Sequence, residues 1–249
     1  MNFLNSPYLL FIFSLVLLSL SAQIGYLLQN KARRLTEEDR DDLGLVLNAT
    51  LTLLALLIGF SFSMAVSRYD VRKNYEEAEA NAIGTEYVRA DMLPPDDAAK
   101  VRGLLRNYLD QRLLFYTTTD PNQIARINAE TSQLQKELWS AVKPGTKMQP
   151  TAVFALLVSG MNDVLNSQGY TQAAWWNRIP TGAWTLMAVI AIGSSILIGY
   201  HGRRRLLFLI VPLGVSLAFF LIADIDSPRR GAIRVVPQNL LSLSQSLAP

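Results

Sequence analysis

The chain has 249 residues, of which 50% are hydrophobic and 17% are charged, and it contains no cysteine and one histidine. Without cysteine the chain can form no disulfide, thiol nucleophile or Cys/His zinc site. A formal net charge of +3 is too small to indicate a nucleic-acid partner. The apolar residues are clustered into long stretches, which predicts a membrane protein.

Four apolar stretches are candidates for membrane-spanning segments. Crossing the hydrocarbon core takes about 20 apolar residues in a helix. Backbone exposed to lipid must satisfy its own hydrogen bonds, so each stretch is predicted to be helical. In chain order, the stretches are Tyr8–Leu28, Leu43–Ser67, Gly182–Tyr200 and Leu206–Ala223.

The first stretch also has features of a secretory signal, because Ser19-Leu20-Ser21 resembles a small-x-small cleavage site. A secretory signal begins with basic residues and has a short apolar core. Here Met1 to Pro7 contains no Lys or Arg, and the apolar character continues to Leu28. We therefore expect an uncleaved first helix.

These spans predict an all-α polytopic membrane protein with four parts. Residues 1–67 hold spans one and two, 68–181 form an extramembrane helical domain, 182–223 form a hairpin of spans three and four, and 224–249 form a tail. Thr36 and Asp39 resemble a capping signal for the helix leading into span two. Apolar residues at helical spacing predict three helices in the domain: 97–116, one after Pro121 that ends at Lys143-Pro144-Gly145, and 151–166.

Span two is predicted to continue out of the membrane as one helix to about Met92, where Pro94-Pro95 stops it. One face of this helix is small or polar for about 55 Å at 1.5 Å per residue, which exceeds the bilayer thickness. This stripe consists of Asn48, Thr52, Ala55, Gly59, Ser63, Asp70, Asn74, Asn81 and Thr85. Two of its steps are seven residues long, and the small residues Ser67 and Ala78 lie within them.

Two interpretations of the stripe compete. Small residues let membrane helices approach closely, and a few hydroxyl groups then form hydrogen bonds between them. Alternatively, the stripe lines a water-filled path shared by several subunits, because polar residues in spans usually face a bundle interior or a cavity. Taken alone, the residues favour close helix packing.

The run from Gly59 to Tyr69, GFSFSMAVSRY, resembles the second span of bestrophins. In bestrophins a Gly-Phe pair is followed by an apolar stretch, then by Thr-Arg and an aromatic residue. Bestrophins are pentameric anion channels with four spans per subunit, and three bulky apolar residues of span two form a narrow neck. The resemblance implies that the neck positions here are Thr52, Leu56 and Phe60. Thr52 departs from the family's apolar pattern.

A group of bacterial bestrophin-like proteins is similar over most of the chain. The shared features are EANAIGT from Glu79 to Thr85, Tyr87, Arg89, Ala90-Asp91, and DIDSPRRG from Asp224 to Gly231. The resemblance implies a homo-oligomer, pentameric in bestrophins, that conducts small inorganic ions and contacts membrane lipid. It also implies an inner-membrane location with both termini and the middle domain in the cytoplasm. The numbers of Lys and Arg residues near the spans are equal on the two sides of the membrane. If the basic residues of the long middle domain are discounted, the balance favours the opposite orientation, with that domain in the periplasm.

The remaining candidates have simpler interpretations. Asp224 and Asp226 occupy the place of an acidic calcium clasp in some animal bestrophins, but two carboxylates are few for calcium. A pairing with Arg229 or Arg230 is the simpler expectation. His201 and Arg203-Arg204-Arg205 are predicted at the membrane interface, with Trp175, Trp176 and Trp184 as aromatic anchors. The acidic residues of the helical extension are predicted to be solvated or paired with Arg72, Lys73 and Arg89; they are Glu76, Glu77, Glu79 and Glu86.

No phosphate-binding glycine loop, nucleophile elbow or HExxH motif is present, so we predict no enzymatic activity, no cofactor and no metal. The function predicted first is an oligomeric bestrophin-like ion channel, anion-conducting by resemblance. The alternative is a non-conducting membrane scaffold or signalling protein whose helical domain binds a partner. The predicted pore-lining residues are Asn48, Thr52, Ala55, Leu56, Gly59, Phe60, Ser63, Asn74, Asn81 and Thr85.

Overall fold

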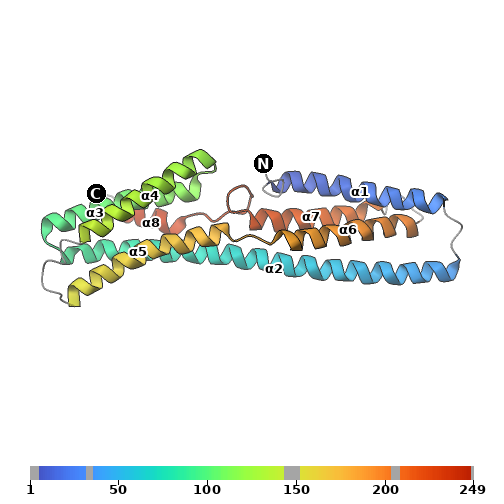
Figure 1. The fold of residues 1–249 in the computed structure, drawn as a ribbon, viewed down its shortest axis with the longest axis horizontal. Coiled ribbons are helices and arrows are strands. Elements are labelled where there is room, and N and C mark those ends of the chain that lie inside the picture. Colours follow the sequence, from blue (N-terminus) through green and yellow to red (C-terminus); the bar gives the residue numbers. More distant parts are fainter. Residues whose placement is uncertain (1–5, 32–35, 143–151, 203–207, 248–249) are drawn as a thin grey trace. The chain divides into compact units, whose positions relative to one another are not determined.

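The computed structural model describes residues 6–31, 36–142, 152–202 and 208–247, and every regular element in these ranges is a helix (Figure 1). The all-α fold class is therefore confirmed. Lys143-Pro144-Gly145 and Arg203-Arg204-Arg205 lie outside the described residues. The helices are α1 (Pro7–Lys31), α2 (Glu37–Arg89), α3 (Pro95–Thr117), α4 (Pro121–Val142), α5 (Ala152–Trp176), α6 (Thr181–His201), α7 (Ile210–Asp226) and α8 (Gln238–Ser246).

Helix α2 is a single helix of 53 residues, as the uninterrupted sequence predicts (Figure 1). It begins with a reciprocal cap: the Asp39 backbone N–H donates to Thr36 Oγ1 at 3.2 Å, and the Thr36 N–H donates to Asp39 Oδ2 at 3.0 Å. At its other end, Ala90–Met92 form a 3-10 turn. The predicted continuous helix is thus confirmed, with its last turn tightened before Pro94.

The chain divides into two compact units, and α2 contributes to both. Unit 1 comprises Met1–Arg68 and Arg178–Arg234, and unit 2 comprises Tyr69–Asn177 and Val235–Pro249. Unit 1 therefore contains α1, the first part of α2, α6 and α7. Unit 2 contains the rest of α2 with α3, α4, α5 and α8.

In unit 1, α1 packs along α6 and α7 (Figure 1). The α1–α6 contact is close because each helix places a glycine against the other's backbone. A Cβ at Gly25 would overlap the Ile196 carbonyl oxygen, and a Cβ at Gly199 would overlap that of Ala22. Small residues allow this approach between membrane helices, where packing and hydrogen bonding drive association.

In unit 2, the core lies among α2, α3, α4 and α5. Its buried centre includes Tyr108, Phe115, Leu138 and Met161. Trp175 belongs to this core: its ring lies 4.9 Å from that of Phe115, and it is 5% exposed. The prediction of Trp175 as an interface anchor was therefore wrong, because α5 extends to Trp176 instead of ending near residue 166.

Three stretches of the described chain are long and apolar enough to cross a membrane: Pro7–Asn30, Glu37–Met92 and Ala152–His201. The last one includes both α5 and α6. Helix α7 has 17 residues, at the lower limit for a membrane-spanning helix. It packs on α1 and α6. Four spans therefore remain a prediction.

Candidate ion pathway along helix α2

One face of α2 is buried within the chain. Its buried positions recur every three, four or seven residues, so they lie on one side of the helix. They are Leu54, Ser61, Ala65, Arg72, Glu76, Glu79, Ile83 and Glu86, with the buried Ala80 at the edge of the same face. Helix α2 is thus held to its own chain by a single face, which is apolar or small in unit 1 and rich in charge in unit 2.

The opposite face of α2 carries the predicted pore-lining residues. All ten are exposed in the single chain, from Asn48 to Thr85. The bulkiest two, Leu56 and Phe60, are 54% and 63% exposed. Only 6% of the most apolar 18-residue stretch of this helix is buried within the chain. Such a surface requires lipid or further copies of the chain to cover it.

A polar groove lies beside this face in unit 2. It has a volume of about 470 Å³ and contains Asn81 and Thr85 of α2 together with side chains of α8. The α8 side chains are those of Asn239, Ser242, Leu243 and Ser246. The sequence analysis missed α8. Pro237, followed by leucines at helical spacing from Leu240 to Leu247, is the signal that could have predicted it.

Glu76 holds the first turn of α8. It accepts the Leu240 backbone N–H at 2.9 Å and an Asn239 side-chain N–H at 2.6 Å. The first backbone N–H groups of a helix have no partner within the helix and favour negative charge. Glu76 is 1% exposed, so this buried carboxylate fixes α8 beside α2.

Glu79 forms the centre of a second buried network. It pairs with Arg112 of α3 and accepts hydrogen bonds from the Tyr116 hydroxyl at 3.3 Å and the Thr171 hydroxyl at 3.2 Å. Burial is the largest effect on the pKa of Arg112 and lowers it, but Glu79 together with Tyr108 and Tyr116 outweighs burial, so the net shift is upward. The interpretation of this glutamate as solvated, or paired with a nearby residue of its own helix, was wrong.

Arg72 is also buried, at 1% exposure. Its side chain donates to the carbonyl oxygens of Ala174 and Asn177, each at 3.3 Å. These carbonyl groups lie at the C-terminal end of α5, where a cation is favourable. Arg72 therefore fixes the end of α5 against α2.

The two aspartates in the last turn of α7 organise the backbone around them. Asp224 accepts the N–H groups of Ala232 and Ile233 at 2.7 and 2.8 Å. Asp226 pairs with Arg178 at 3.2 Å and accepts the Ile179 N–H. Arg178 is thus a partner of Asp226 that the sequence analysis had not considered. Both oxygens of Asp224 are occupied by backbone N–H groups, which does not favour a calcium clasp.

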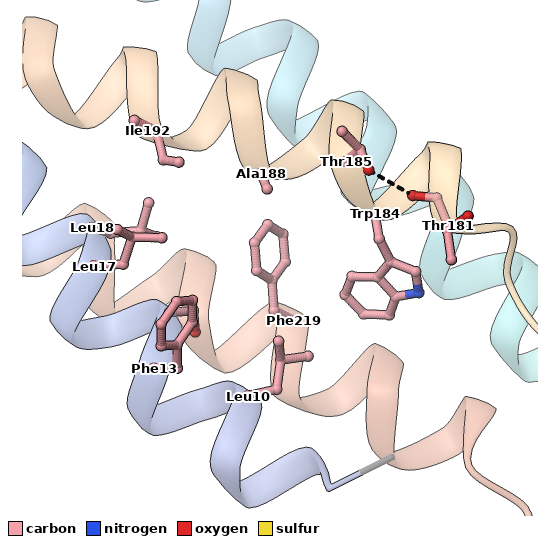
Figure 2. A pocket seen from close by; sticks show the side chains of 11 residues that line it. Leu10, Phe13, Leu17, Leu18, Thr181, Trp184, Thr185, Ala188, Ile192 and Phe219 are labelled. Carbon is pink, nitrogen blue, oxygen red and sulfur yellow. Dashed lines mark hydrogen bonds between the residues drawn. The ribbon is translucent and has the colours of Figure 1, made fainter. Parts of the chain in front are cut away.

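An apolar pocket of about 390 Å³ lies in unit 1 between α1, α6 and α7. Figure 2 shows Leu10 and Phe13 of α1, Trp184 of α6 and Phe219 of α7 around it. Among its lining residues, only Ser14, Thr181, Thr185 and the Trp184 ring nitrogen are polar, and Thr185 donates to the Thr181 carbonyl oxygen at 3.0 Å (Figure 2). With no charged side chain lining it, this pocket suits hydrocarbon and offers no path for an ion.

Within the described residues, no group of three or more His, Cys, Asp or Glu side chains is placed to hold a metal ion. His201 ends α6 and is half-buried, and its Nδ1 atom has no hydrogen-bond partner among the described residues. The Cβ of a residue replacing Gly44 would lie 3.7 Å from the His201 ring. His201 is therefore packed beside the start of α2.

The long apolar helices and the glycine-mediated packing of α1 on α6 define an all-helical membrane protein. A family model of the Bestrophin-like domain matches residues 14–240. The chain therefore belongs to the Bestrophin-like family, as the motifs of α2 and of residues 224–231 had indicated.

The fold is that of solved bacterial bestrophin homologs. A single-site variant of a homolog from Klebsiella pneumoniae has a TM-score of 0.67 at 14% identity, with 95% of this chain and 98% of that chain covered. Another structure of a homolog from Klebsiella pneumoniae has a TM-score of 0.63 at 16% identity, with 94% and 98% covered. At such low identity the similarity concerns the fold alone. No curated protein matched.

Proposed function

We propose that the protein is an oligomeric ion channel of bestrophin type, in which α2 lines the pore. The observation that carries this proposal is the exposed small and polar face of α2, opposite the face that packs on the chain. Within a membrane, an unpaired polar stripe on an apolar helix is costly unless it borders water or other protein. Several copies arranged with this face toward a common axis satisfy that need.

Small inorganic anions are the proposed permeant ions. The ten pore-lining residues carry no charge, and the polar ones offer amide N–H and hydroxyl groups, which can donate hydrogen bonds to an anion. The α8 side chains Ser242 and Ser246 add two hydroxyl groups beside Asn81 and Thr85. The bestrophin resemblance supports a pentamer with its helical domain in the cytoplasm.

Leu56 and Phe60 are the proposed constriction. They are the bulkiest members of the exposed face, and a ring of large apolar side chains closes a pore by excluding water. Replacing both by Ala should raise ion flux into liposomes that contain the purified protein. Phe62→Ala is the matched control, because Phe62 is also exposed, at 41%, but lies nearly half a turn from Phe60.

The oligomeric state is measured on the same preparations by mass determination in nanodiscs. A monomer at all concentrations would exclude the channel. An intact oligomer without flux in any variant would favour the scaffold function instead. Flux that responds to Phe62→Ala and not to the Leu56 and Phe60 pair would place the pore on another face of α2.

A further inference from the structure

The side chain of Glu86 is fully buried in unit 2, near the end of α2. Neither of its carboxylate oxygens has a hydrogen-bond partner among the described residues. The nearest cation is Arg89, whose Nη1 atom lies 3.9 Å from Glu86 Oε2 and whose side chain is 25% exposed. A buried carboxylate without hydrogen bonds is costly when ionised, so its neutral form is favoured.

Gly160 of α5 covers this carboxylate. A Cβ at position 160 would overlap both Glu86 Oε2 and Arg89 Nη1. The absence of a side chain therefore lets the backbone of α5 lie directly over Glu86, which excludes water from its oxygens. Gly169 of the same helix has open space around it, so close approach is specific to Gly160.

The other two buried glutamates of α2 differ from Glu86 in their partners. Glu76 has two hydrogen-bond donors, and Glu79 has an arginine and two hydroxyl groups. Hydrogen bonds to a carboxylate favour its charged form, and desolvation without them favours the protonated form. Of these three glutamates, Glu86 is the one that has no hydrogen-bond donor among the described residues.

The charged groups that face Glu86 come from two helices. Arg89 on its own helix lowers its pKa, and the exposed Asp163 of α5 raises it. Helix α3 contributes the apolar side chains of Val101 and Leu105 to the same core. The charged residue between them, Arg102, pairs with Asp91. Burial is the largest effect and raises the pKa of Glu86 to about 7.

We propose that Glu86 is a proton-binding site that couples the packing of α5 on α2 to pH. With the proton bound, the neutral carboxyl group stays beneath Gly160. When the proton leaves to solvent, the carboxylate requires water or a closer Arg89, and either change loosens the contact at Gly160. Because Asn81 and Thr85 lie on the same stretch of α2, ion flux then depends on pH. This last step rests on the proposed channel function.

Infrared spectroscopy of the full-length protein in nanodiscs tests the site without any flux measurement. A protonated carboxyl group has a C=O band that an ionised carboxylate lacks. In the wild type, one such band should persist above the usual carboxyl range and disappear around pH 7. Glu86→Gln should abolish this band, and Glu77→Gln, which alters an exposed glutamate of the same helix, should retain it.

A second variant keeps the test decisive if Glu86→Gln does not fold. Asp163→Asn removes the anion that raises the pKa of Glu86, so the band should titrate at lower pH than in the wild type. A wild-type protein without a carboxyl band above the ordinary range, or a band unchanged by Asp163→Asn and by Glu86→Gln, would overturn the proposal.

Amide hydrogen exchange and flux separate the two proposals. Exchange in α5 around Gly160 should be slower below pH 7 than above it, after correction for the intrinsic rate, and Glu86→Gln should remove the difference. If this holds while no variant conducts, the proton site stands and the channel function fails. If the protein conducts with the same pH dependence in wild type and Glu86→Gln, the coupling of Glu86 to the pore is wrong.

Discussion

Leu54 and Leu56 are two residues apart on α2, and Leu54 is 2% exposed whereas Leu56 is 54% exposed. Two residues correspond to more than half a helical turn, so identical side chains lie on opposite faces. One leucine packs against its own chain, and the other is free to contact lipid, water or another copy. This difference separates the residues that stabilise the protomer from those proposed to act in conduction.

The first prediction concerns these two leucines. Leu54→Ala should lower the free energy of unfolding by about 2 kcal/mol or more, because it leaves a cavity where the side chain was fully packed. Leu56→Ala should change it by about 0.5 kcal/mol or less. Unfolding of the purified protein in detergent measures both values. Equal losses would mean that the two faces are not distinguished by packing.

The second prediction concerns the contact between α1 and α6. Gly199→Leu should prevent the helices from approaching, because even a Cβ at this position overlaps the Ala22 carbonyl oxygen. Gly193→Leu is the matched control on the same helix, since nothing lies within 4 Å of a Cβ there. The yield and thermal stability of the folded protein should fall sharply for the first variant only. A stable Gly199→Leu variant would contradict this packing.

The third prediction concerns orientation. Lys100 is exposed on α3, and the native chain has no cysteine, so Lys100→Cys introduces a single labelling site. In intact cells this cysteine should resist a membrane-impermeant thiol reagent, and it should react after the cells are opened. Labelling in intact cells would place the helical domain outside the cytoplasm, which is the orientation favoured when the basic residues of the long domain are discounted.

The fourth prediction concerns stability and pH. Burial raises the pKa of Glu86 from its usual 4.5 to about 7, so the folded state binds more protons than the unfolded state between these values. The contribution of Glu86 to the free energy of unfolding should therefore be greatest below about pH 4.5, and it should fall as the pH rises to about 7. The loss is on the order of 3 kcal/mol.

Because other carboxyl groups also titrate, this effect is read from the difference between wild type and Glu86→Gln. The difference in unfolding free energy should change with pH through the window from 4.5 to 7 and be constant above it. A difference that does not vary with pH would show that Glu86 titrates alike in the folded and unfolded states.

Features that depend on neighbours in sequence could be predicted without the structure. The lengths of the apolar stretches predicted helices, and the reciprocal bonds of Thr36 and Asp39 confirm the start of α2. The phase of the small and polar stripe depends only on helical periodicity, and the stripe residues share one exposed face of α2. Its role in conduction remains a prediction.

Long-range pairing was decided only by the tertiary structure. The charge pattern along α2 suggested local partners for its glutamates. Instead, Glu79 pairs with Arg112, which is 33 residues away in the sequence. Glu76 accepts a hydrogen bond from Leu240 of α8, which is 164 residues away. Trp175 similarly packs in a core formed by α3 and α5. Helical periodicity determines which residues share a face of one helix. Which faces meet, and therefore which charges are buried together, depends on how the helices pack, and no local pattern encodes that.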